Sequence, residues 1–240
     1  MMNNATLTRL KKDLRSYAEP EKAAFFPRFF KTGKGEYAEG DIFIGVTVPH
    51  VRMVAQSYRT LSLSDAKKLI ASPVHEERLC ALIIWDFQFD KGDSNTRTAI
   101  YETYNECIDR INNWDLVDQT ASRIVGAYLA DKPRDRLYEL ARSSNLWKRR
   151  ISIIATLYFI VKLHEYKDTF ALSEILLHDK HDLIHKAVGW MLREVGKHID
   201  EDVEQSFLKR HYKTMPRTMF RYAIERFPEN IRLAYLEGNI

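Results

Sequence analysis

An aromatic residue and a carboxylate stand one helical turn apart in the segment of residues 111–118. Trp114 and Asp118 are separated by four positions, so a helix would place both side chains on one face. A buried carboxylate is costly unless it is paired, and this face is therefore poorly suited to a core. An aromatic plane beside an acidic group suits a cation or an electron-poor sugar. The segment is the first candidate for a functional site.

Related positions recur at intervals of 36 residues along the chain. The first column of such positions contains Arg78, Trp114, Arg150 and Lys186, and the second, one helical turn later, contains Leu82, Asp118, Ile154 and Trp190. A column of this kind predicts that several structural repeats direct one face toward a common target.

The elements that must position these residues are helices. The 240 residues are 45% hydrophobic and include only 9 Gly and 7 Pro, which favours a helical core over a β-rich one. From residue 62 onward, antiparallel helix pairs follow one another with a period of about 36 to 40 residues, which is the range of HEAT-type arrays. The tetratricopeptide consensus is missing. We therefore predict an all-α fold, a curved right-handed solenoid of HEAT-like antiparallel helix pairs whose second helices line a concave face.

No linker divides the chain, and we expect a single HEAT-like repeat domain over residues 1–240. Within it, residues 1–61 form N-terminal helices, a Gly-containing loop and a short extended segment at 42–48, and residues 62–240 form the helix-pair repeats. The second N-terminal helix is rich in Phe; core packing is the favoured role, with one or two rings able to cap a groove. No Gly-Lys-Ser/Thr follows the loop glycines, so a nucleotide-binding loop is rejected.

Charge and cysteine content limit the classes of function. The formal charge of +4, from 37 Lys and Arg against 33 Asp and Glu, is too small to establish a nucleic-acid partner by itself. Cys80 and Cys107 lack the paired spacing of a zinc site and are expected to be buried thiols. The longest apolar run, residues 151–161, is too short to span a membrane, and no signal sequence begins the chain. We expect a cytoplasmic protein in a reducing environment.

Several of these residues have competing interpretations. Core packing explains Trp147, whereas Trp114 and Trp190 each share a face with a charge, which is unusual in a core. Asp118 could pair with Arg150 or Lys186, which would keep the carboxylate ionised. Residues 178–182 collect possible metal ligands, but a polar turn is the favoured interpretation.

Four segments, residues 35–49, 113–118, 147–150 and 186–194, occur in an order that resembles the AlkD-type DNA alkylation repair glycosylases. The resemblance extends over nearly the whole chain. It implies a monofunctional DNA glycosylase of base excision repair that removes cationic N3- and N7-alkylpurines from double-stranded DNA held in the concave face. It also implies that the lesion is not flipped into a pocket, unlike in the usual glycosylase scheme.

Matched motif by motif, the resemblance places the catalytic aspartate at Asp118 and the sugar-contacting tryptophans at Trp114 and Trp190. It places a DNA-contacting arginine at Arg150. The further expected DNA contacts are Arg149, Lys186, Arg78 and Phe29, the last at a position where the founding member of the family carries a tyrosine. The protein is expected to act as a monomer without a metal or organic cofactor. The alternative is a non-catalytic HEAT-like protein of the same superfamily that binds branched DNA.

Overall fold

The computed structural model describes residues 4–239, and the α-helices in this range number fourteen. The chain divides between Thr120 and Ala121 into two compact units, each of which is described by itself. The first unit contains α1 (Asn4–Arg15), α2 (Pro20–Phe30), α3 (Val48–Ser57), α4 (Leu63–Ile70), α5 (His75–Lys91), α6 (Ser94–Glu106), the 3-10 helix η1 (Ile108–Arg110) and α7 (Trp114–Thr120). The second contains the π-helix η2 (Ala121–Gly126), α8 (Asp135–Ala141), α9 (Leu146–Ala155), the π-helix η3 (Phe159–Leu163), α10 (Lys167–Ile175), α11 (Asp182–His198), α12 (Glu201–His211), α13 (Arg217–Ala223), the 3-10 helix η4 (Ile224–Arg226) and α14 (Glu229–Glu237).

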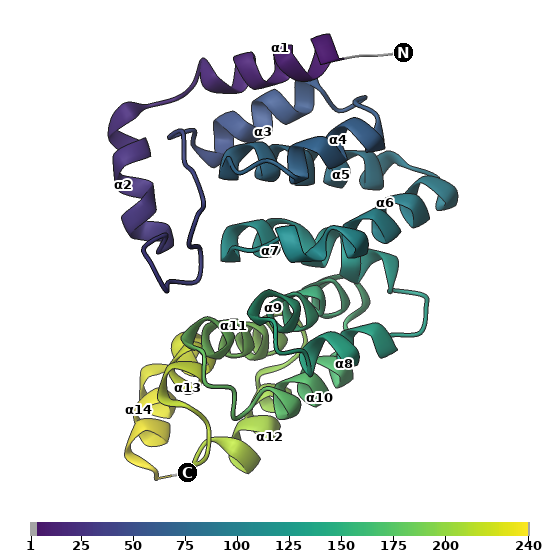
Figure 1. Ribbon diagram of the computed structural model, residues 1–240. Helices are drawn as coiled ribbons and strands as arrows, with labels where there is room; N and C mark the ends of the chain where they lie inside the picture. The colour runs from purple at the N-terminus through teal and green to yellow at the C-terminus, as the bar shows by residue number, and fades with distance from the viewer. Residues whose placement is uncertain (1–3, 240) are drawn as a thin grey trace. The chain divides into compact units, whose positions relative to one another are not determined.

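Both units are built from helix pairs, as Figure 1 shows. In the first unit α4 packs against α5, and α5 also contacts α3 and α7 in a row of second helices. In the second unit α8 packs against α9, and η2, α9, α11 and α13 form the corresponding row. In each unit, the apolar stripes of the helices are buried where paired helices pack against each other, as the 3.6-residue periodicity requires. The predicted all-α, HEAT-like repeat fold is confirmed.

Two stretches of the helix pairs contain a π-helix. The seven-residue α7 is followed directly by the π-helix η2, and α9 is followed by the π-helix η3 at residues 159–163. A π turn widens the helix by one residue and is common next to functional positions. The C-terminal α14 falls within residues 62–240, which were predicted to form helix pairs.

The predicted extended segment forms no strand within the described residues, where it contributes a single bridge between Ile42 and Val74. The Glu76 carboxylate explains this difference. Its oxygens accept the backbone N–H groups of Ile44, Gly45 and Val46 at 3.0, 2.9 and 3.2 Å. A buried side chain therefore satisfies the donors that a neighbouring strand would otherwise take.

The two cysteines, Cys80 and Cys107, are buried free thiols, as the sequence predicted. In the part of the chain that the structure describes, none of the helices combines the length and the apolar character that a bilayer crossing requires.

Candidate functional site

The candidate site of the first unit lies at the beginning of α7. The Asn113 side-chain oxygen accepts the backbone N–H of Trp114 at 2.8 Å, and the Asn113 carbonyl accepts the N–H of Val117 at 3.2 Å. This capping arrangement begins the helix at Trp114. Trp114 and Asp118 then lie one turn apart on the same helix, and both side chains are half-buried. A substrate can therefore reach both.

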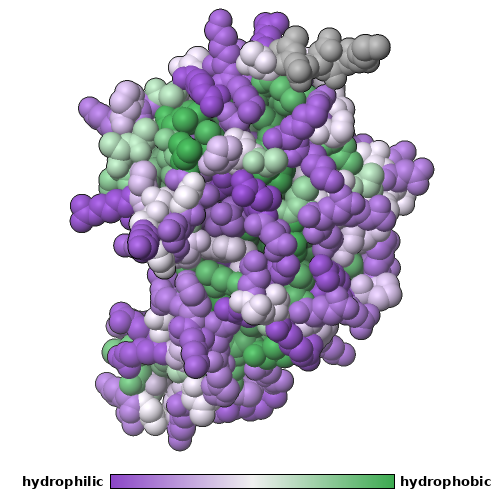
Figure 2. Space-filling view, in the orientation of Figure 1, coloured by the Kyte–Doolittle hydropathy of each residue, from purple (hydrophilic) through white to green (hydrophobic). Residues whose placement is uncertain are grey.

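A group of phenylalanines holds the indole of Trp114. The Phe30 ring stacks on Trp114 with centroids 5.3 Å apart and also on Phe43 at 4.7 Å. Phe29 meets Trp114 edge to face at 5.9 Å and keeps 51% of its surface exposed. Figure 2 shows hydrophobic surface at the upper left, where α2 lies in Figure 1. The Phe-rich helix thus has both expected roles, since Phe30 packs in the core and Phe29 forms an open aromatic edge beside Trp114.

A buried ionic network lies behind this aromatic group. The His75 ring donates from Nε2 to Asp115 Oδ2 at 2.7 Å and from Nδ1 to Asp41 Oδ2 at 3.2 Å. The guanidinium of Arg78 donates to the same Asp41 oxygen at 2.6 Å. Burial works against a charged imidazole, but the Asp115 and Asp41 carboxylates outweigh it and raise the pKa of His75 to about 9. The ring is therefore a cation at neutral pH.

The network joins three segments that are distant in the sequence. Asp41 belongs to the loop after α2, His75 and Arg78 to the first turn of α5, and Asp115 to the first turn of α7. Because Asp115 is the neighbour of Trp114, the network sets the position of the α7 N-terminus. An acidic residue in the first turn is also favoured by the helix dipole.

The structure gives Arg78 a different role from the predicted DNA contact. Its side chain is 1% exposed, and besides Asp41 it donates to the backbone carbonyls of Ser72 and Pro73 at 3.1 and 3.3 Å. A guanidinium enclosed in this way cannot meet a phosphate on the surface. The prediction for Arg78 is therefore corrected: it is a structural cation that neutralises Asp41.

Asp118 lies next to two polar features of the first unit. Its charge adds to the rise in the pKa of the buried Tyr104 phenol, which burial causes in the main. The neighbouring Gln119 side chain accepts a hydrogen bond from Arg52 at 3.0 Å. Arg52 therefore brings a positive charge close to the Asp118 end of α7.

In the second unit, the two arginines of the 147–150 segment are engaged with the protein itself. Arg150 is 5% exposed, and its guanidinium donates to the Leu183 carbonyl. Arg149 donates to Asp179 at 2.6 Å and to the carbonyls of Ser143 and Ser144. Arg149 thus holds α9 to the turn before α11, and Arg150 holds it to the first turn of α11. These roles do not fit the direct DNA contacts expected of the two residues. Trp147 is buried, as its predicted core role requires.

The residues predicted on α11 are more accessible. Trp190 is half-buried and donates its indole N–H to Glu194 at 3.0 Å. Lys186 is 39% exposed in its side chain and forms an ion pair with Asp182 at 2.7 Å. The indole hydrogen bond fixes the ring plane of Trp190, so α11 presents an oriented aromatic residue with a cation one turn before it.

The segment of residues 178–182 is a capping turn, as predicted. Asp179 accepts the N–H of His181 at 2.8 Å, and His181 in turn accepts the N–H of Leu183 at 3.2 Å at the start of α11. Among residues 4–239, no group of three or more His, Cys, Asp or Glu side chains is arranged to hold a metal ion.

Half of the members of the 36-residue columns lie in the interior and cannot face a target on the surface. Leu82 and Ile154 are fully buried, and Arg78 and Arg150 are nearly so. The periodicity reflects equivalent positions of the repeat, because repeated helices place equivalent residues against the same neighbouring helix. These four buried members therefore serve the packing of the array.

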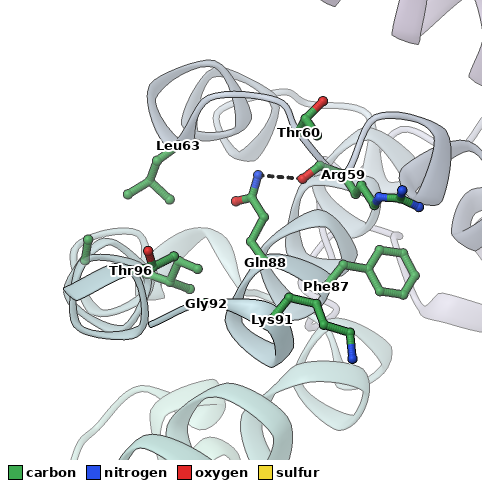
Figure 3. Close-up of a pocket in the computed structure, with 10 residues that line it drawn as sticks. Arg59, Thr60, Leu63, Phe87, Gln88, Lys91, Gly92 and Thr96 are labelled. Carbon is green, nitrogen blue, oxygen red and sulfur yellow. Dashed lines mark hydrogen bonds between the residues drawn. The ribbon is translucent and has the colours of Figure 1, made fainter. Parts of the chain in front are cut away.

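A cavity of about 560 Å³ lies at the other end of α5, lined by residues of the α3–α4 connection and of α5 and α6 (Figure 3). Gln88 donates across it to the carbonyls of Arg59 and Leu61 at 2.9 and 2.7 Å. Gln88 is thirteen positions beyond His75 on α5, which corresponds to about 20 Å along the helix axis. This cavity is separate from the site at Trp114.

The family model for DNA alkylation repair enzymes matches residues 10–227. The chain belongs to this family. A solved structure, described as a predicted DNA alkylation repair enzyme from Enterococcus faecalis, superposes with a TM-score of 0.65. The superposition covers 88% of this chain and 97% of that one at 16% sequence identity, which shows the shared fold. Among curated proteins none matches.

Membership in the DNA alkylation repair family associates the chain with DNA repair. Sequence reasoning within this family overlooked His75, Asp41 and Asp115. The sequence contained one signal for this network. Asp115 directly precedes two apolar residues, Leu116 and Val117, and such a position places the carboxylate toward the core of a helix pair. A core-facing acid requires a buried cationic partner, and this requirement could have directed attention to His75.

Proposed function

We propose that the protein is a DNA glycosylase that excises cationic N3- and N7-alkylated purines from duplex DNA. The observation that carries the proposal is the half-buried pair of Trp114 and Asp118 on α7, with Phe29 beside it. Family membership supports a role in the repair of alkylated DNA. The pair combines an aromatic surface with a carboxylate, which are the two groups that a developing positive sugar requires.

The proposed chemistry follows from the charge of the substrate. An N3- or N7-alkylpurine already carries a positive charge and leaves as a neutral base, so the enzyme need not protonate it. As the glycosidic bond breaks, the sugar carbon C1′ gains oxocarbenium character. A fixed carboxylate opposes this charge more strongly in the transition state than in the ground state, and this difference accelerates the reaction. Asp118 would supply the charge and orient the attacking water.

The aromatic side chains would contact the deoxyribose. Trp114 is held by Phe30 and Trp190 by its hydrogen bond to Glu194, so both planes are fixed before substrate binds. Lys186 is the accessible cation beside Trp190 and would contact a phosphate. With the sugar as the reacting group, the base can stay in the duplex, and no closed pocket for it is required.

The first prediction concerns Asp118→Asn, which keeps the size and hydrogen bonding of the side chain but removes its charge. We expect duplex DNA binding to persist and the excision rate to fall about 100-fold or more. Release of free base from a duplex containing 7-methylguanine under single-turnover conditions measures this effect. Glu106→Gln removes an exposed charge of the same unit and is the control.

The same assay separates the proposal from its rival. A duplex containing uracil should release no base, because uracil is a neutral leaving group that requires protonation or strong hydrogen bonding. A bulky 7-alkylguanine should be excised, since no closed pocket confines the base. Full activity of the Asp118→Asn variant would contradict the proposed mechanism. DNA binding by the wild type without release of any base would identify a non-catalytic DNA-binding protein.

A further inference from the structure

A second cavity, of about 590 Å³, lies within the second unit between α11 and α13. Its lining residues are Arg193 of α11, Thr218, Arg221 and Tyr222 of α13, and Glu225 of η4. The two helices approach closely because Gly189 has no side chain; a Cβ atom there would lie 2.3 Å from the Met219 carbonyl and 2.6 Å from Tyr222 Cβ. The close packing places Tyr222 directly against the turn of α11 that carries Trp190.

The part of the sequence that contains α13 is rich in basic residues, and α13 contributes Arg221 to the cavity. Residues 205–226 contain a single acidic side chain, Glu225, and six cationic ones, Lys209, Arg210, Lys213, Arg217, Arg221 and Arg226. Within the described range of the chain, Arg221 is exposed and forms no ion pair or hydrogen bond through its guanidinium. The cavity therefore presents one uncompensated guanidinium.

The other guanidinium of the cavity is neutralised. Arg193 forms an ion pair with Glu225, and its Nε atom is buried without a hydrogen-bond partner. Glu225 is 59% exposed in its side chain, so water competes with Arg193 for the carboxylate. The Glu225 carboxylate thus occupies Arg193 and limits the charge that this guanidinium can offer to an anion.

We propose that this cavity binds a backbone phosphate of the DNA. The inference rests on the proposed function, because it places the phosphate next to the nucleotide whose sugar Trp190 would contact. Arg193 follows Trp190 by three positions, so the two side chains are neighbours on α11. Arg221 provides the charge and a fork of N–H donors that matches phosphate oxygens, and the Tyr222 hydroxyl can donate a further hydrogen bond.

Glu225 is the acidic residue of the cavity and opposes the binding of an anion there. Its carboxylate repels a phosphate and occupies Arg193, so it lowers the affinity of the cavity for DNA. Removal of the charge in Glu225→Gln should free Arg193 and strengthen binding. A gain of affinity is informative because a folding defect cannot produce it.

The experiment measures the affinity for an unmodified duplex by fluorescence anisotropy over a series of salt concentrations. For Arg221→Ala we expect weaker binding and a decrease of about 0.9 in the slope of log affinity against log salt, the change expected for one phosphate contact. For Glu225→Gln we expect tighter binding and a steeper slope. Arg136→Ala, which removes an exposed arginine paired with Glu139 on α8, should leave both quantities unchanged.

The outcomes distinguish this inference from the proposed function. An unchanged slope for Arg221→Ala, an equal loss for Arg136→Ala, or weaker binding by Glu225→Gln would each overturn the phosphate site. Release of 7-methylguanine by the wild-type protein is measured on the same preparations. Base release with an unchanged Arg221→Ala slope rejects the phosphate site alone, whereas the expected slopes without base release reject the proposed chemistry alone.

Discussion

At the scale of single residues, the position of Trp114 depends on side chains around it more than on its own helix. α7 contains only seven residues, too few to be stable by itself. The stacked ring of Phe30 and the edge of Phe29 hold the indole from the side of α2. The indole of Trp114 is therefore oriented by contacts that cross from α2 to α7.

The exposed ring of Phe29 provides a test of this support. In Phe29→Ala the edge-to-face contact with Trp114 is lost, and we expect the excision rate to fall about 2- to 10-fold, in line with the energy of one aromatic pair. Phe29→Tyr keeps the ring and should retain activity close to the wild type. Single-turnover excision of 7-methylguanine measures both variants.

Phe25→Ala is the matched control, because Phe25 is equally exposed on α2 and stacks on Phe29 without a described contact to Trp114. If Phe25→Ala lost as much activity as Phe29→Ala, a general effect of the hydrophobic surface would explain the result, and a specific support of Trp114 would be refuted.

At the scale of the helices, α7 is anchored through the buried ionic network at its N-terminus. Asp115 on α7, His75 on α5 and Asp41 in the loop after α2 form hydrogen bonds in the interior, where an unpaired charge is strongly unfavourable. A change in one partner leaves the others buried and uncompensated. The network thus makes the position of α7 sensitive to the protonation of a single imidazole.

The pH dependence of stability follows from the sign of the His75 shift. The ordinary pKa of 6.5 is raised to about 9 in the folded protein, so the contribution of His75 to stability is fully present below pH 6.5. It decreases as the pH rises and is lost above about 9, a change on the order of 3 kcal/mol. Urea unfolding at several pH values between 6 and 10 measures it.

His75→Gln is the variant that tests this assignment. It should be less stable than the wild type at about pH 6, and its stability should depend less on pH between 6.5 and 9. His50→Gln, which replaces a partly buried histidine outside the network, serves as the control. A pH profile of His75→Gln identical to that of the wild type would show that the imidazole does not hold the proton.

The contact of α11 with α13 depends on a glycine. The Cβ atom added in Gly189→Ala would meet the Met219 backbone, which cannot move without shifting α13. We expect a loss of about 1 to 3 kcal/mol in the free energy of unfolding, as is typical of an overpacked core. Thermal unfolding followed by circular dichroism provides the measurement.

The control for the α11–α13 contact is Gly33→Ala, a glycine replacement outside that contact. The added methyl group would meet only the end of the flexible Glu36 side chain, so the cost should be small. Equal losses in the two variants would indicate a general effect of replacing glycine and would argue against a specific requirement at the α11–α13 contact.

At the scale of the whole molecule, two buried groups, His75 and Glu204, lower the stability of the fold as the pH rises. Burial, reinforced by the charge of Glu201, raises the pKa of Glu204 from 4.5 to about 9. The carboxyl therefore stays protonated in the folded chain while it ionises in the unfolded chain. Because the folded state holds the extra proton, stability falls between pH 4.5 and 9, in the same direction as for His75.

Glu204→Gln separates this effect from that of His75. Glutamine resembles the protonated carboxyl, so the variant should be more stable than the wild type at about pH 8, and the difference should disappear near pH 4. Urea unfolding at both pH values tests the expectation, with Glu201→Gln as the control on the same helix. A variant that is destabilised at pH 8 would show that the ionised carboxylate is accommodated in the fold.

The sequence by itself determined the features that depend on local pattern. The 3.6-residue periodicity predicted the helix pairs and the HEAT-like fold, because the burial of one helix face requires that pattern wherever a helix packs in a row. The segments around Trp114, Trp147 and Trp190 indicated the DNA alkylation repair family, since a short ordered motif is visible without coordinates. The core position of Trp147 was predicted in the same way.

Only the tertiary structure decided which charges are inside. Arg78 and Arg150 had the types and spacing of surface cations, yet both are buried against partners 33 to 37 residues away. The link between His75, Asp41 and Asp115 likewise joins segments that are brought together only by helix packing. The energy of a charge depends on its surroundings in three dimensions, and a periodic sequence pattern specifies which face of a helix is buried but does not specify which side chains meet there.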